Sequence, residues 1–302
     1  MFYLLRFLIM MITYISMVLQ KIKLLLMLTR WKDWMLIPLI LVMGYFITLH
    51  TASVYTDLIF MLVAFSLSLS FGFAINEYFD APYDKMKPIV KNVISKNLIS
   101  KSHAAVFCTF LLVACIVVGY CFLSFRTFVL LVAFCILCYA YSAPPFRMKE
   151  RAYLGIINHG IFYPIIFLAG YTANLPFNAE AAIFSIVAFM LSLLTDITQE
   201  IRDMDVDKKS KFKTTALEMG YIRSLTSLKI ITALSIIFFI TGVLLFRPIY
   251  ILLLSLGMVF YIKALVANPS RSELFAKSID AWNRGIITSA LIGLFILFYF
   301  YF

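Results

Sequence analysis

Charged residues are scarce in this chain of 302 residues: they account for 14% of it, whereas hydrophobic residues account for 63%. The mean hydropathy is +0.98, and a water-soluble domain cannot bury that much apolar surface in one core. The alternation of polar and apolar residues typical of membrane strands is also missing. These absences exclude a soluble globular protein. They predict an all-α integral membrane protein, because helices satisfy their own backbone hydrogen bonds in lipid.

Histidine and cysteine are rare as well, with three and five copies. All five cysteines lie inside apolar runs, so no disulfide framework is indicated, and helix packing explains them better than a metal or redox site. No Ser-His-Asp arrangement, Walker loop or dinucleotide-binding glycine motif is visible. His159 is open to two interpretations, contact with a substrate or a hydrogen bond in helix packing. The chemistry must therefore come from another class of side chain.

Long apolar runs recur along the chain, and each can cross the roughly 30 Å hydrocarbon core of a bilayer as a helix. Within one domain, residues 30–302, they predict nine transmembrane helices around a central cavity, at 35–53, 56–77, 103–123, 127–144, 154–172, 178–199, 226–245, 248–266 and 284–302. Residues 1–29 form an apolar leader that Arg6, Lys21 and Lys23 interrupt. The leader is predicted to be an interfacial helix, an additional span or a targeting segment. It lacks a small-residue cleavage site, which argues against a removed signal peptide.

The formal net charge of +11 is distributed unevenly along the chain. On these spans, Arg126 and Arg247 are the only basic residues on one side of the membrane. All others lie before the first span, in the loops after the even-numbered spans, or at the span ends beside those loops. This asymmetry argues against a nucleic-acid partner and predicts that the N-terminus and the basic loops are cytoplasmic.

Two acidic clusters interrupt the apolar pattern: "NEYFDAPYD" ends the second predicted span, and "TDITQEIRDMDVDKK" ends the sixth. In the first cluster, Asn76 and Asp80 share a helical face. Pro82 predicts that this helix stops before Asp84, which then lies on the following turn. In the second cluster, intervals of four, three and four residues place all the carboxylates except that of Asp205 on one face. These are Asp196, Glu200, Asp203 and Asp207.

Carboxylates at the end of a membrane segment are energetically unfavourable unless they pair or bind ions. One interpretation is that they pair with the loop lysines and cap helix ends. The other is a magnesium site, because Mg²⁺ takes oxygen ligands and keeps further positions for water and phosphate oxygens. Two clusters that face each other therefore predict a diphosphate substrate held through Mg²⁺.

Basic loops follow both clusters. For most of their lysines, setting the topology and touching anionic lipid is a sufficient explanation. In "YSAPPFRMKER" two prolines restrict the chain directly before Arg147 and Lys149, which favours phosphate contact for these two residues. We include Lys91, Arg147 and Lys149 among the predicted substrate-binding residues.

Four segments together resemble the UbiA superfamily of intramembrane prenyltransferases. "NEYFDAPYD" is similar to its N-D-x-x-D-x-x-x-D motif, and "DITQEIRDMDVDKKSKFKTTA" to its second aspartate motif. "YSAPPFRMK" resembles its Y-S-x-P-P-x-R-x-K loop, and "LTRWKDW" the Arg–Trp start of its first helix, which adds Arg30 to the substrate-binding residues. The resemblance runs from about residue 27 to the C-terminus, in family order.

The resemblance implies Mg²⁺-dependent transfer of a prenyl group from a prenyl diphosphate to a hydrophobic acceptor, at the cytoplasmic side of the membrane. It implies that Asn76, Asp80 and Asp84 hold Mg²⁺ on one side of the diphosphate, and Asp203 and Asp207 on the other. Glu200 stands where several members have Asp and is included among the metal ligands, whereas Glu77 departs from the usual Asp. Asp196 and Tyr141 are expected in the substrate site; Tyr141 either stabilises an allylic cation or anchors the backbone. The acceptor stays open between a lipid, a carotenoid and a quinone-type precursor.

A membrane transporter is the alternative function, because intramembrane carboxylates also mark proton and cation paths. Transporters tend to place such residues near the midplane on broken helices. Here both clusters lie at the same membrane boundary beside cationic loops, and this favours the enzyme.

The charge asymmetry predicts that Lys91→Cys and Lys211→Cys react with a membrane-impermeant thiol reagent from the cytoplasmic side only. Ser53→Cys, in a loop without positive charge, is the control and is expected to react from the opposite side. Sided labelling in intact cells and inverted vesicles measures this. Labelling of position 91 or 211 from outside alone would reverse the topology.

Overall fold

The computed structural model describes residues 2–48, 55–85 and 92–246, and nearly all regular structure in these ranges is helical. A leading helix, α1 (Phe2–Leu28), precedes the short helices α2 (Trp31–Trp34) and α3 (Pro38–Ile47). The long helices α4 (Tyr55–Asp84), α5 (Lys101–Phe122), α6 (Phe125–Ser142), α9 (Ala179–Lys209) and α11 (Tyr221–Leu245) follow. Between them lie the 3₁₀ turn η1 (Met148–Glu150), α7 (Leu154–Gly160), α8 (Phe162–Asn174) and α10 (Thr215–Met219).

Seven segments of the described chain are long and apolar enough to span a membrane, which confirms an all-α integral membrane protein. Six of them coincide with spans predicted between residues 56 and 245. The seventh, Met10–Leu28, lies in the leader. Of the predicted span 35–53, the described part contains the ten-residue helix α3. The predicted spans 248–266 and 284–302 lie outside the described residues, so the total of nine stays a prediction.

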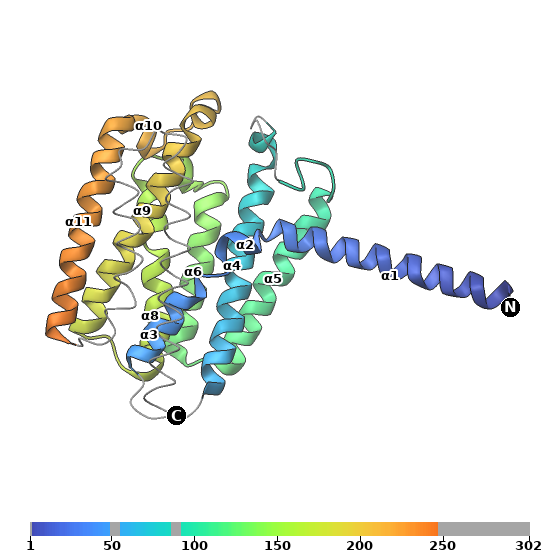
Figure 1. Cartoon of the computed structure of the whole chain (residues 1–302), viewed down its shortest axis with the longest axis horizontal. Helices are drawn as coiled ribbons and strands as arrows, with labels where there is room; N and C mark the ends of the chain where they lie inside the picture. Colours follow the sequence, from blue (N-terminus) through green and yellow to red (C-terminus); the bar gives the residue numbers. More distant parts are fainter. Residues whose placement is uncertain (1, 49–54, 86–91, 247–302) are drawn as a thin grey trace.

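The long helices lie side by side in a bundle, whereas α1 leaves the bundle crosswise to α4 and α5 (Figure 1). Within the bundle, α4 packs on α5 and α6, α8 packs on α3, α6 and α9, and α9 packs on α11. Side-chain caps start several of these helices: Ser100, Ser124 and Asn178 each accept a hydrogen bond from a backbone N–H in the first turn of α5, α6 and α9. Helices α4, α6 and α9 run in the same direction and end at the same end of the bundle (Figure 1).

Helix α4 continues past the point where the sequence predicted that it ends. Pro82 lies inside its last turn, and Asp84 is still helical, so the placement of Asp84 on a following turn was wrong. Two side chains of the next loop stabilise this turn. Asn92 donates to the carbonyl of Glu77 (2.7 Å), and Ser95 to the carbonyl of Ala81 (2.7 Å). Pro82 lacks the N–H that would bond the carbonyl of Tyr78. The contacts of Asn92 and Ser95 tie the last turns of α4 to the following loop on either side of that position.

Helices α3 and α8 approach each other closely through two glycines. A Cβ atom at Gly44 would collide with the carbonyl oxygen of Phe167, and one at Gly170 with the carbonyl oxygen of Leu41. Both obstacles are backbone atoms, which cannot rotate away. Membrane helices gain van der Waals contact when small residues let their backbones approach in this way.

Gly170→Ala is therefore expected to destabilise the protein by about 1–3 kcal/mol through overpacking at this crossing. Gly119→Ala is the control, because there the added methyl group meets only the side chains of Leu131 and Phe128, which can move. Thermal unfolding in detergent measures both. An equal or smaller loss for Gly170→Ala would show that the crossing does not need close backbone contact.

Candidate active site

The polar residues of the two acidic clusters gather where α4, α6 and α9 end. Asp80, on the last two turns of α4, accepts hydrogen bonds from Arg147 (3.4 Å) and Lys149, both of which follow α6. The side chains of Arg147 and Lys149 are 12% and 11% exposed, so two cations are nearly buried around one carboxylate. Burial lowers the pKa of Lys149, and the Asp80 carboxylate opposes that shift.

Aromatic rings extend this site from α4 to the loop after α9. The guanidinium of Arg147 lies 4.7 Å from the ring centroid of Tyr83 and 5.8 Å from that of Phe212, and the two rings are 4.9 Å apart. Arg147 also pairs with Glu150, whose carbonyl accepts from the N–H of Lys213 (3.2 Å). The loop after α6 therefore bridges the end of α4 and the chain that follows α9.

A second polar group lies behind the end of α4. Asn92 donates to the carboxylate of Asp84 (2.9 Å), and its own oxygen accepts from the N–H groups of Ile94 and Ser95. Asn92 and Asp84 are both buried. Asn92 was not among the predicted site residues. In the sequence it is a single amide residue in the loop after the first acidic motif, and no spacing relates it to that motif.

Arg30 is placed beside α4 by an ion pair with Glu77 (3.5 Å), in addition to its contact with Asp33. Burial would lower the pKa of Arg30, but the carboxylates of Glu77 and Asp33 outweigh burial and raise it. Glu77, the residue that departs from the usual Asp, therefore holds Arg30 against α4. The predicted site residue Lys91 lies outside the described residues.

The carboxylates of α9 have different surroundings, although they share one helical face. Asp196 is buried and accepts a hydrogen bond from the hydroxyl of Tyr141 (3.3 Å). Glu200 accepts from the N–H of Ala216 (2.8 Å) in the first turn of α10. Asp203 pairs with its neighbour Arg202 (2.6 Å), and Asp207 is partly exposed near the end of the helix. Asp205 is exposed, as its position off this face predicts.

The donor set suits a hard divalent cation, because it consists of carboxylate and amide oxygens from two helices. Asn76 and Asp80 lie one turn apart on α4 and are both partly buried. Within residues 2–48, 55–85 and 92–246, however, no group of three or more His, Cys, Asp or Glu side chains is already arranged around a point that could hold a metal ion. Asp80 is engaged by cations instead. For Asp80 to bind a metal ion, another anion would have to replace it as the partner of Arg147 and Lys149.

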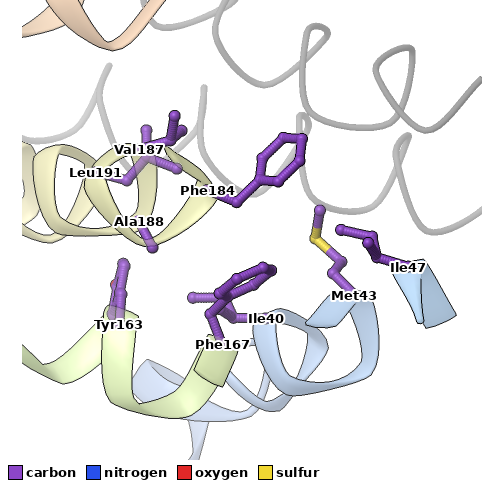
Figure 2. A pocket seen from close by; sticks show the side chains of 9 residues that line it. All are labelled: Ile40, Met43, Ile47, Tyr163, Phe167, Phe184, Val187, Ala188 and Leu191. Carbon is purple, nitrogen blue, oxygen red and sulfur yellow. The ribbon is translucent and has the colours of Figure 1, made fainter. Parts of the chain in front are cut away.

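An apolar pocket lies between α3, α8 and α9 (Figure 2). Nine side chains line it, all apolar except for the phenol of Tyr163: Ile40, Met43, Ile47, Tyr163, Phe167, Phe184, Val187, Ala188 and Leu191. The side chain of Tyr163 also lies beside those of Thr195 and Asp196, so one residue connects the pocket to the polar end of α9.

Buried cations and carboxylates lie at one end of the bundle, and an apolar pocket lies between its helices. This combination suits a membrane protein that binds a molecule with an anionic head and a hydrocarbon tail. The model of the UbiA prenyltransferase family matches residues 35–283. The chain therefore belongs to this family of prenyltransferases, as the four motifs indicated.

Known proteins support this membership. Digeranylgeranylglyceryl phosphate synthase of Thermococcus sibiricus is 26% identical over 175 residues, which are 57% of this chain and 59% of that protein. The chain thus spans less than two thirds of that relative's length.

Solved structures share the fold. A UbiA homolog from Archaeoglobus fulgidus superposes with a TM-score of 0.74 at 21% identity, over 88% of this chain and 95% of its own. The same homolog bound to GPP and Mg²⁺ superposes with a TM-score of 0.73 at 21% identity, over 89% and 99%. An apo homolog from Aeropyrum pernix K1 superposes with a TM-score of 0.70 at 16% identity, over 86% and 96%.

Asn92→Ala is expected to destabilise the protein by about 1–3 kcal/mol, because it leaves buried partners in α4 and in the loop without hydrogen bonds. The exposed loop residue Lys96, changed to Ala, is the control and should alter stability little. Thermal unfolding in detergent measures the difference. Equal stability of the two variants would mean that Asn92 does not hold the end of α4.

Proposed function

We propose that this protein transfers a prenyl group from a prenyl diphosphate to a hydrophobic acceptor within the membrane. The observation that carries the proposal is the pair of nearly buried cations, Arg147 and Lys149, at the end of α4. Arg147 and Lys149 share the carboxylate of Asp80, and Arg147 also pairs with Glu150. A bound anion would take the place of these carboxylates beside the two cations. A diphosphate offers several oxygens in the geometry that a guanidinium and an ammonium recognise.

The metal is proposed to be Mg²⁺, held by Asn76, Asp80 and Asp84 from α4 and by Asp203 and Asp207 from α9. Glu200 was predicted as a further ligand. Its contact with the N–H of Ala216 favours a structural role instead, in which it caps α10. When bound, Mg²⁺ would neutralise negative charge that develops on the diphosphate as the prenyl C–O bond breaks.

The chain's own residues would have three roles. Arg147 and Lys149 would move from Asp80 to the diphosphate and stabilise it as a leaving group. Burial lowers the pKa of Lys149, and a bound polyanion would favour its charged form in the same way as Asp80 does. The apolar side chains between α3, α8 and α9 would border the hydrocarbon chain, and helices packed around the site would exclude water from the allylic cation. Tyr141 would stabilise the allylic cation through its ring. The ring centroid of Tyr141 lies 5.9 Å from that of His159 and 6.0 Å from that of Phe162.

The location of the site at the cytoplasmic side follows from the charge asymmetry and is part of the proposal. The basic loops after the second, fourth and sixth predicted spans, which follow the two acidic clusters or contain Arg147 and Lys149, were all assigned to that side. The other partners are the prenyl diphosphate, the acceptor and membrane lipid.

Asp80→Asn and Asp203→Asn are expected to lower turnover of a prenyl diphosphate by ~10²-fold or more, which corresponds to about 2.7 kcal/mol of transition-state stabilisation. Asp205→Asn, on the same helix as Asp203 but off the acidic face, is the matched control and should retain activity. Product formation from labelled donors with host lipid extract measures this, and thermal unfolding confirms that each variant is folded. Near-normal activity of both Asn variants would refute the two-cluster site.

A separate prediction concerns binding. A non-hydrolysable prenyl diphosphate analogue should raise thermal stability clearly with Mg²⁺ and only slightly with EDTA, because metal and diphosphate share ligands and must favour each other's binding. Arg147→Ala should reduce this rise. Equal stabilisation with Mg²⁺ and with EDTA would exclude metal ligation by the carboxylates and would favour a transporter.

A further inference from the structure

Helix α1 has no role in the proposed prenyl transfer. The family match begins at residue 35, after α1 has ended. Of its most apolar stretch, within Met10–Leu28, 6% is buried inside the protein, compared with 56% for the equivalent stretch of α4. Its last turns hold it to the bundle: Leu28 is fully buried, and Leu24 and Leu25 pack against the core. Exposed apolar surface of this extent marks an interaction site, so α1 requires an apolar partner.

The direction of α1 shows how it meets the membrane. It joins the bundle at the end where α4 ends and α5 begins: Arg30, just after α1, pairs with Glu77, and Lys101 at the start of α5 lies over the ring of Tyr78 (5.0 Å). From that end α1 runs crosswise to α4 and α5 (Figure 1). Transmembrane helices tilt by about 20° on average from the bilayer normal, so a helix that crosses them lies close to the plane of the membrane. Its 27 residues extend about 40 Å along that plane.

The exposed residues of α1 divide between two faces. Apolar residues recur along one face at intervals of three and four: Phe7, Met11, Ile15, Val18 and Ile22. Polar residues recur along the opposite face at intervals of seven, three, four and three: Arg6, Thr13, Ser16, Gln20 and Lys23. Lys21 lies at the border between the two faces. This division is typical of a helix that lies in a membrane interface, with acyl chains against one face and headgroups against the other.

The charge of α1 indicates which headgroups it meets. The helix contains three basic residues, Arg6, Lys21 and Lys23, and no acidic residue. All three are exposed, and none of them pairs with a carboxylate among the described residues. Trp31, directly after α1, is 41% exposed, and tryptophan is enriched at the level of the headgroups. Unpaired cations at this level attract anionic lipids.

We propose that α1 lies in the plane of the membrane interface at the polar end of the bundle and binds anionic lipids there. Its apolar face would contact acyl chains, and Arg6, Lys21 and Lys23 would contact anionic headgroups. A lipid surface fits α1 better than a second copy of this chain does. Helices that pair within a membrane approach through small residues, and α1 has neither glycine nor alanine. The proposal does not depend on prenyl transfer.

The depth of single positions distinguishes this placement from a transmembrane one. Each variant carries one new cysteine in the full-length protein, in which Cys121→Ser removes the exposed native thiol. A spin label on the new cysteine is measured in lipid bilayers through its collisions with oxygen and with a water-soluble nickel chelate. Val18→Cys is expected to lie deeper than Gln20→Cys by about 5–10 Å, because the two side chains lie on opposite faces. Met11→Cys should likewise lie deeper than Thr13→Cys.

Three outcomes of these measurements would overturn the proposal. A depth that changes steadily from position 11 to position 20 would show that α1 spans the bilayer. Dipolar broadening between labels at a high ratio of lipid to protein would show that a second copy of this chain covers α1. Reaction of Gln20→Cys with an impermeant thiol reagent from the side opposite to Lys211→Cys would place α1 at the wrong end of the bundle.

A quenching experiment tests the headgroups. A fluorophore on Gln20→Cys is placed in mixed vesicles in which either phosphatidylglycerol or phosphatidylcholine is brominated. Quenching by the anionic lipid is expected to be at least about twofold stronger. The combined variant Arg6→Gln/Lys21→Gln/Lys23→Gln should lose this preference and keep the depth pattern, with thermal unfolding as the check on folding.

The matched control removes three exposed lysines from the end of α9 and the loop after it: Lys208→Gln/Lys209→Gln/Lys211→Gln. It should keep the preference for phosphatidylglycerol. Equal quenching by the two lipids in the unsubstituted background, or an unchanged preference after the three substitutions in α1, would refute the binding of anionic lipids by α1.

Discussion

The contact of Asp80 with Arg147 and Lys149 is the interaction on which the polar end of this protein depends. Two cations with about a tenth of their side chains exposed would be strongly unfavourable beside a bilayer without an anion next to them. Asp80 offsets part of this charge, and Glu150 pairs with Arg147 as well. Carboxylates therefore hold both cations at the end of α4 before any ligand binds.

Other contacts hold this arrangement in place. The stacking of Arg147 on Tyr83 and Phe212 ties the loop after α6 to α4 and to the chain after α9. Asn92 and Ser95 close the last turn of α4 from behind, and Arg30 pairs with Glu77 from the preceding segment. At the other side of the bundle, Gly44 and Gly170 let α3 and α8 pack backbone against backbone. The pocket between α3, α8 and α9 borders this crossing.

The acidic face of α9 shows how one sequence pattern can contain several different environments. Glu200 contacts a backbone N–H, Asp203 contacts an arginine, and Asp196 keeps one oxygen without a partner among the described residues. These environments differ although spacing along the chain places all three residues on one face. Burial and the available partners, which come from other elements, make the difference.

The membrane class, the positions of six spans and the two acidic motifs could all be predicted from the sequence alone. These features are local: span length follows from uninterrupted apolar residues, and helical faces follow from spacing along the chain. The prediction that Arg147 and Lys149 contact phosphate is also local, because it rests on the two prolines that restrict the segment directly before them.

Other features depend on how distant segments pack, and the sequence could not predict them. Pro82 was expected to end α4, but the helix runs to Asp84, and Asn92 and Ser95 from the next loop bond its last turns. Spacing could not distinguish Asp196 from Glu200, because both lie on one helical face. The partner of Asp196 comes from α6, 55 residues away along the chain, and the partner of Glu200 comes from α10, 16 residues away. Burial and pairing are set by such distant contacts, so the choice between a ligand, a cap and an unpaired carboxylate is made only when the helices pack.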